Sequence, residues 1–127
     1  MPERSPYDYA LIRVVPRVER GECINAGVIL FSRPRAFLGV LIHLNEARLL
    51  ALAPDIDLQV VREQLRLIDL ISSGQREAGS LARMSLSERF HWLVAPRSTI
   101  IQTSQVHSGL CGDPAATLKH LLETMVL

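Results

Sequence analysis

The chain has 127 residues, of which 48% are hydrophobic and 21% are charged, and its formal net charge is +1. A chain of this length can bury a core of its own, and we expect a single domain over residues 1–127. The charge gives no field that would attract nucleic acid or a membrane surface, and no apolar run reaches the ~20 residues that cross a bilayer. Neither a nucleic-acid-binding protein nor a membrane protein is expected.

The cysteines and the N-terminal residues indicate the cellular compartment in which the protein is expected. Neither Cys23 nor Cys111 belongs to a CxxC pair or to a zinc-like spacing with the four histidines. The first ten residues lack the apolar core of a signal peptide. The sequence has no phosphate-binding loop and no dinucleotide fingerprint. We therefore expect a reduced, cytoplasmic protein without a metal or a cofactor.

The first 45 residues form three apolar runs separated by two arginine-rich loops. The runs are residues 7–15, 23–31 and 37–45, and the loops are PRVERGE and SRPRA. Apolar runs joined by such short loops predict an antiparallel three-strand meander. The two loops lie at opposite ends of that meander. Their arginines therefore cannot form one basic patch, which is a second argument against nucleic-acid binding.

After Asn45 the apolar spacing changes to that of helices. Residues 46–53 can form a short helix that ends before Pro54, and either Asp55 or Asp57 can cap a longer helix over residues 57–72. Residues 72–80, with two glycines and three serines, are predicted as a loop.

Two further helices have start signals of their own. Ser85 with Glu88 three positions later is a capping box, and it predicts a helix from Leu86 that stops at Pro96. Asp113 followed by Pro114 predicts a helix over residues 114–125.

A fourth strand is expected between these two helices. Residues 98–106 are predicted as that strand, with polar positions typical of a sheet edge, and residues 107–113 as a turn. Because strands and helices do not alternate, the fold class is α+β: an antiparallel sheet built on the meander plus a fourth strand, with three to four helices packed on it.

Symmetric closure of both loops predicts a polar row across the meander. Arg13 would lie opposite Asn25, and Asn25 opposite His43. A guanidinium, an amide and an imidazole in one row suit a small anion or polar ligand, with Arg97 and His107 brought in by the fourth strand. The alternative is structural: Arg13 pairs with a carboxylate, and the other two satisfy buried backbone groups.

The same register also assigns the apolar side chains to faces. It places Phe31 opposite Phe37. It puts Val28 and Leu30 on the core face, and Ile29 and Phe31 on the second face.

Catalytic signals are weak. A serine and a histidine on neighbouring elements suggest a hydrolase with His43 or His107 as acid and base, but the sequence has no G-x-S-x-G elbow and no assignable acid partner. The catalytic residues stay unknown, and the sequence leans away from an enzyme.

Two strings resemble a known family. SPYDYALIRVVPRVERGECINAGVILF and ERFHWLVAPRSTIIQTSQVHSGL are similar to small bacterial proteins known only as domain of unknown function 3037. The resemblance covers nearly the whole chain and brings no activity, cofactor or catalytic residue. It implies a HipA-like kinase as partner, because members are often encoded beside such kinases. Cys23 and Ala26 depart from the aromatic residue and the valine expected there, which argues against a role for the Cys23 thiol.

Three functions follow. The first is a non-catalytic interaction module that docks on a partner protein, with the strand over residues 98–106 as the edge of interest. The second is a protein that binds a small anionic ligand or phosphate through the polar row, and the third is a small hydrolase. The sequence leaves a homodimer open.

Overall fold

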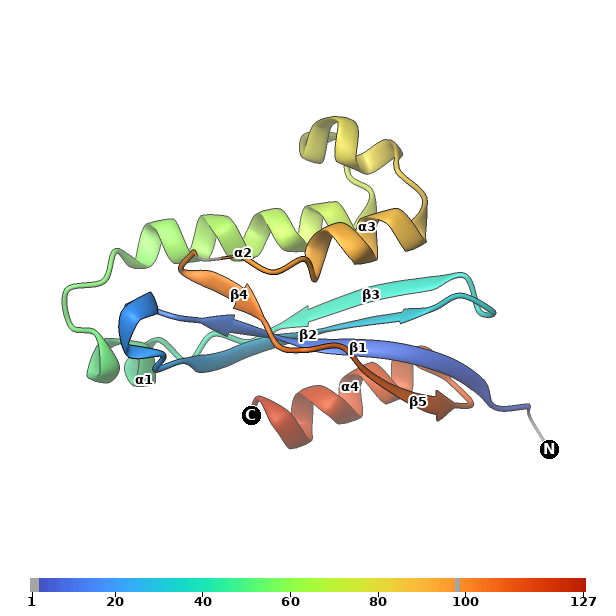
Figure 1. Ribbon diagram of the computed structural model, residues 1–127, viewed down its shortest axis with the longest axis horizontal. Helices are drawn as coiled ribbons and strands as arrows, with labels where there is room; N and C mark the ends of the chain where they lie inside the picture. The colour runs from blue at the N-terminus through green and yellow to red at the C-terminus, as the bar shows by residue number, and fades with distance from the viewer. Residues whose placement is uncertain (1–2, 98) are drawn as a thin grey trace.

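The computed structural model describes residues 3–97 and 99–127, which form an antiparallel sheet with helices on both faces (Figure 1). The strand order is β3-β2-β1-β4, and β5 also pairs with β1. The α+β class is confirmed. The strands are β1 (Ser5–Val14), β2 (Ile24–Ser32), β3 (Phe37–Ile42), β4 (Ile101–Thr103) and β5 (His107–Cys111). The helices are α1 (Glu46–Leu52), α2 (Leu58–Ser73), α3 (Leu86–Leu93) and α4 (Pro114–Met125), with the 3-10 segments η1 (Val18–Arg20) and η2 (Arg76–Arg83).

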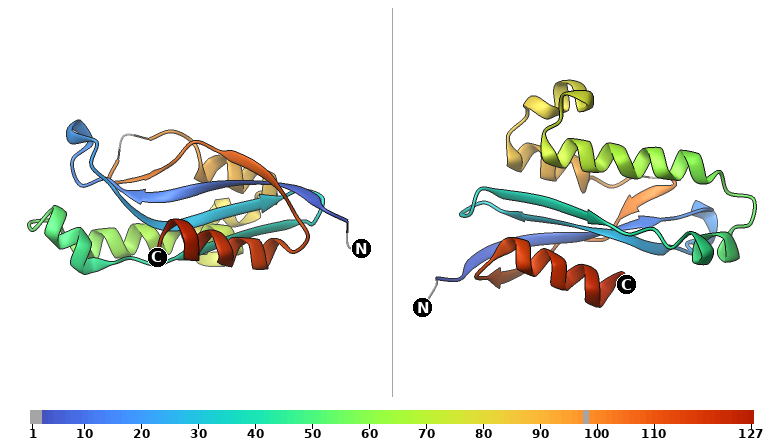
Figure 2. Two further views of the ribbon diagram at one scale, coloured as in Figure 1. Left: turned by 90° about the horizontal axis from the view of Figure 1, so that it is seen from below. Right: turned by 180° about the vertical axis from the view of Figure 1, so that it is seen from behind.

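The helices form two layers, with α2 and α3 on one face of the sheet and α4 on the other (Figure 2). Each layer has its own core. The core under α2 and α3 includes Ile12, Val14, Ile29, Phe31, Leu65, Ile71 and Phe90. The core under α4 includes Leu11, Val28, Leu30, Leu118 and Leu121. β2 is buried on both faces.

The predicted helix starts are confirmed by their caps. The Asp57 carboxylate accepts hydrogen bonds from the first amides of α2, so Asp57 and not Asp55 is the cap. Ser85 and Glu88 form the complete capping box of α3. Asp113 caps α4, which begins at Pro114. The predicted loop over residues 72–80 is wrong in part, because α2 continues to Ser73 and η2 follows.

A bulge in β2 shifts the register between β1 and β2. Arg13 lies opposite Asn25 as predicted, but Ile12 lies opposite Gly27, so Ala26 is an extra residue in β2. A Cβ at Gly27 would lie 2.7 Å from the Leu41 carbonyl oxygen, so only glycine fits this close approach. Because the bulge reverses the alternation that follows it, the predicted faces of residues 28–31 are wrong: they are exchanged between the two cores.

The turn of the second hairpin, between β2 and β3, is one residue shorter than predicted. Ser32 pairs with Phe37, and Phe31 lies opposite Leu38 rather than Phe37. The turn over residues 33–36 closes with a bond from the Ala36 amide to the Arg33 carbonyl, and Ala36 takes a left-handed φ of 49°. Because of this shift of one residue, His43 does not lie opposite Asn25, where it was predicted.

The predicted fourth strand over residues 98–106 is shorter than expected, since only β4 falls within it, and the predicted turn over residues 107–113 is wrong, because it contains β5. β4 covers three residues and pairs with the Ile12–Val14 end of β1, and β5 covers five residues and pairs with the Ser5–Tyr9 end. Residue 98 lies outside the described residues. Between the two strands, the buried Ser104 hydroxyl accepts the Leu11 amide at 2.8 Å. A side chain thus replaces a backbone partner where the edge bends.

Candidate functional site

One member of the predicted polar row, Asn25, connects β2 to α4. Arg13 Nε donates to Asn25 Oδ1 at 3.3 Å, and Asn25 Nδ2 donates to the Met125 carbonyl at 3.1 Å. His43 is exposed beyond the end of β3, and its amide bonds the Ala26 carbonyl. The structure therefore brings together two of the three predicted residues, and the amide of Asn25 holds the last turn of the helix. A ligand role for the row stays a prediction.

Arg97 and His107 lie on opposite faces of the sheet. The Arg97 guanidinium lies 4.0 Å from the Trp92 ring centroid, and Trp92 packs on the core under α2 and α3. The His107 ring lies 5.3 Å from that of Tyr9, which packs on the core under α4. Because the sheet separates them, they do not complete one binding site.

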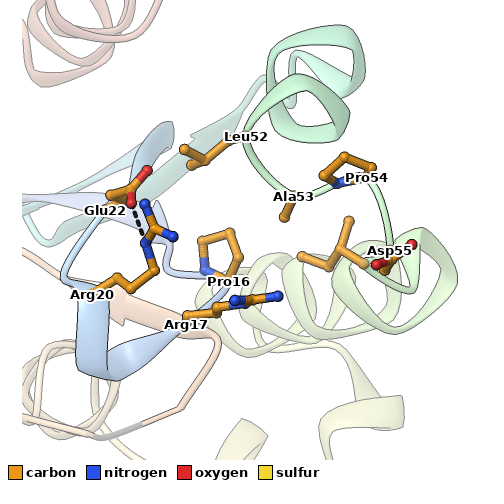
Figure 3. A pocket seen from close by; sticks show the side chains of 9 residues that line it. Pro16, Arg17, Arg20, Glu22, Leu52, Ala53, Pro54 and Asp55 are labelled. Carbon is orange, nitrogen blue, oxygen red and sulfur yellow. Dashed lines mark hydrogen bonds and ion pairs between the residues drawn. The ribbon is translucent and has the colours of Figure 1, made fainter.

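A hollow lies between the β1–β2 connection and the α1–α2 turn (Figure 3). We call it the loop hollow. Its volume is about 290 Å³. Apolar side chains form much of its wall, and two arginines and two carboxylates border it. The lining residues are Pro16, Arg17, Arg20, Glu22, Leu52, Ala53, Pro54, Asp55 and Ile56.

The charges of the loop hollow are only partly paired. Arg20 Nε forms an ion pair with the Glu22 carboxylate. Within residues 3–97 and 99–127, neither Arg17 nor Asp55 forms an ion pair. Figure 3 shows Arg17 extending from the β1–β2 connection in the direction of the turn that carries Asp55. One guanidinium and one carboxylate at the hollow are thus available to a ligand.

The outer side of β3 is a free edge. β3 is the terminal strand of the sheet and pairs only with β2 among the described residues. Because the His43 amide bonds the Ala26 carbonyl, the alternating pattern of an antiparallel ladder turns the amides and carbonyls of Leu38, Val40 and Ile42 away from β2. We call these three residues, with their outward backbone groups, the β3 edge.

A groove of about 440 Å³ runs along the β3 edge toward α2. We call it the edge groove. Five apolar residues line it, and charged residues form its rim. The apolar residues are Val40, Leu41, Ile42, Leu44 and Leu65, and the charged ones are Glu46, Arg62, Arg66 and Asp69.

Two ion pairs neutralise most of this rim. Arg62 bonds Glu46 through both Nε and Nη2, which lowers the pKa of the Glu46 carboxyl and raises the pKa of Arg62. Arg66 pairs with Glu77 at 2.8 Å. Asp69 forms no ion pair in the part of the chain that the structure describes, so the rim keeps one uncompensated negative charge.

The sequence model of a protein family, described as protein of unknown function DUF3037, matches residues 9–126. The chain belongs to the DUF3037 family. No curated protein and no solved structure matches it. The family match confirms the resemblance seen in the two strings, and it assigns no activity to this DUF3037 member.

Sequence reasoning missed both surfaces of this DUF3037 protein. The signal for the β3 edge was present, since residues 37–42 contain no charge and no proline to blunt an edge. The loop hollow has no such signal, because nothing in the spacing shows that residues 16–22 meet residues 52–56. None of its helices in residues 3–97 and 99–127 has the length and apolar character needed to cross a bilayer.

Proposed function

We propose that this DUF3037 protein is a non-catalytic interaction module that docks an extended, apolar and basic segment of a partner protein on the β3 edge. The observation that carries the proposal is an apolar strand of six residues with unpaired backbone groups along one side. Proteins usually blunt such an edge, and edges left open are used to pair with a strand from another chain.

The chemistry of the edge groove defines the segment. A strand added to β3 would place alternate side chains over Val40, Ile42 and Leu65, so apolar side chains are expected at those positions. Asp69 is the one rim charge that no described residue neutralises. A lysine or arginine of the segment would pair with it, and charge complementarity of this kind sets register and partner choice.

The family supplies the first natural partner to test. The resemblance implies a HipA-like kinase encoded nearby, and such a kinase is the proposed owner of the segment. Both cysteines are free thiols, which agrees with an interaction in the cytoplasm.

Selection from a displayed peptide library tests the proposal whichever protein carries the segment. Peptides are selected on the wild-type protein and counter-selected on Val40→Pro, which removes one outward amide of the β3 edge while leaving the ladder to β2 intact. We expect enriched peptides with alternating apolar residues and one basic residue. On binding, hydrogen exchange should slow at the amides of Leu38, Val40 and Ile42.

Two charge variants provide the control. Asp69→Lys should weaken binding of the selected peptides, whereas Glu63→Arg, on α2 but outside the edge groove, should not. Peptides that bind wild type and Val40→Pro equally would place docking elsewhere. Exchange protection of β3 that grows with protein concentration alone would identify a second copy of this chain as the occupant, and would contradict the partner segment.

A further inference from the structure

The loop hollow combines charges of both signs around an apolar wall. Arg20 and Glu22 neutralise each other, which leaves the Arg17 guanidinium and the Asp55 carboxylate as the ionic groups free to meet a ligand. The two come from different elements, Arg17 from the β1–β2 connection and Asp55 from the α1–α2 turn (Figure 3). The charges that border the hollow therefore sum to zero.

We propose that the loop hollow binds a zwitterionic amino acid with a short, branched apolar side chain. The Arg17 guanidinium holds the ligand carboxylate, for which its planar fork is suited. The Asp55 carboxylate accepts the ligand ammonium. The apolar side chain of the ligand packs against Pro16, Leu52 and Ile56. An α-amino acid carries both charges on one carbon, so it fits a small hollow bordered by one free charge of each sign.

Size and charge exclude other ligand classes. A volume of about 290 Å³ lies at the small end of ligand pockets, which suits a metabolite of amino-acid size and not a nucleotide. A phosphate dianion would meet two carboxylates, Glu22 and Asp55, and only one arginine without a carboxylate partner of its own. A purely apolar molecule would use neither the Arg17 guanidinium nor the Asp55 carboxylate.

Both walls of the hollow are held by backbone hydrogen bonds. In η1 the Arg20 amide bonds the Arg17 carbonyl at 3.1 Å, and Gly21, with φ 70°, bonds the Val18 carbonyl. On the other wall the Ala53 amide bonds the Leu49 carbonyl at 2.8 Å, and the Ile56 amide bonds the Ala53 carbonyl. Pro16 and Pro54 add fixed φ angles. A site formed before the ligand arrives loses less entropy on binding.

Calorimetric titration of the full chain with four probes tests the proposal. The probes are leucine, 4-methylpentanoate, which lacks the ammonium, isoamylamine, which lacks the carboxylate, and inorganic phosphate. We expect leucine to bind most tightly and phosphate not to bind. Arg17→Gln should weaken leucine binding about tenfold or more, as the loss of a charge-assisted hydrogen bond predicts. Asp55→Asn should also weaken leucine binding.

4-Methylpentanoate and isoamylamine each carry one of the two charged groups of leucine, so they test the contact with Arg17 and the contact with Asp55 separately. The affinity for 4-methylpentanoate should fall in Arg17→Gln but not in Asp55→Asn, and the affinity for isoamylamine should show the reverse. Arg76→Gln, an exposed arginine of η2 outside the hollow, is the matched control and should bind leucine as wild type does. Phosphate binding in preference to leucine, heats absent with all four probes, or equal losses in Arg76→Gln would each overturn the assignment. None of these variants touches the β3 edge.

Discussion

The two edges of the sheet are built differently. On the side of the β3 edge, β3 is one uninterrupted strand of six residues without a charged side chain. The opposite edge is divided into β4, with three residues, and β5, with five. Between them the Ser104 hydroxyl accepts the Leu11 amide, so a side chain ends one ladder before the next begins. The bend leaves no long straight edge on that side.

The two edges differ in how well they are protected against pairing with a strand of another chain. Short, bent edge strands offer another chain too few backbone groups in register to pair with. The opposite edge of this DUF3037 protein has that protection, and β3 lacks it. This contrast is why the proposed docking site is on β3 and not on the β4–β5 edge, where the sequence had suggested the edge of interest.

The largest effect is expected from proline at alternate positions of β3. Leu41→Pro removes an amide that faces β2 and leaves a buried carbonyl of β2 without its partner, so it should lower the free energy of unfolding by about 2 to 3 kcal/mol more than Val40→Pro. Urea unfolding measures the difference. Leu41→Ala and Val40→Ala correct for the lost side chains. Equal losses in the two proline variants would mean that the outward residues are wrongly assigned.

A smaller loss is expected at the opposite edge. Ser104→Ala leaves the buried Leu11 amide without an acceptor and should destabilise the protein by about 1 to 2 kcal/mol in the same assay. Ser73→Ala is the control, because its hydroxyl bonds only carbonyls of its own helix. If Ser104→Ala unfolds at the wild-type urea concentration, the hydroxyl does not hold this edge.

The smallest effect concerns the rim of the edge groove. Arg62→Gln should return the pKa of Glu46 from its lowered value toward the ordinary one, because the hydrogen bond from Arg62 is what lowers it. The ion pair stabilises the fold above the ordinary pKa of Glu46, and this contribution is lost as the pH falls through the lowered value. The two side chains keep 49% and 40% of their surface exposed, so solvent screens the pair and its contribution is too small to shift the urea midpoint at pH 7 measurably. An NMR titration of Glu46 that is identical in both proteins would show that the pair does not form in solution.

The sequence alone predicted a helix boundary correctly wherever neighbouring residues determine it. Ser85 with Glu88, Asp113 with Pro114, and Pro54 marked helix boundaries through caps and forbidden hydrogen bonds, which depend only on neighbouring residues. The pairing of Arg13 with Asn25 was also predictable, because it lies close to the loop that joins the two strands.

Register farther from the loops was not predictable. β2 is apolar toward both faces, so no polar side chain marks the bulge at Ala26, and the faces of the residues beyond it were exchanged. The left-handed φ of Ala36 shortened the second turn and moved His43 off the polar row. β5 resembled a turn in sequence because its strand character comes from pairing with β1.

The position of β1 has a consequence for synthesis on the ribosome. β1 is made before β4 and β5, yet one of its sides is covered only when those two strands have been made, and the Ser108 hydroxyl bonds Asp8 across a separation of 100 residues. While the chain is being translated, β1 and β2 can pair at once, but the other side of β1 stays open until almost the last helix. Such distant pairing slows folding and leaves an apolar strand exposed to chaperones or to aggregation during this interval.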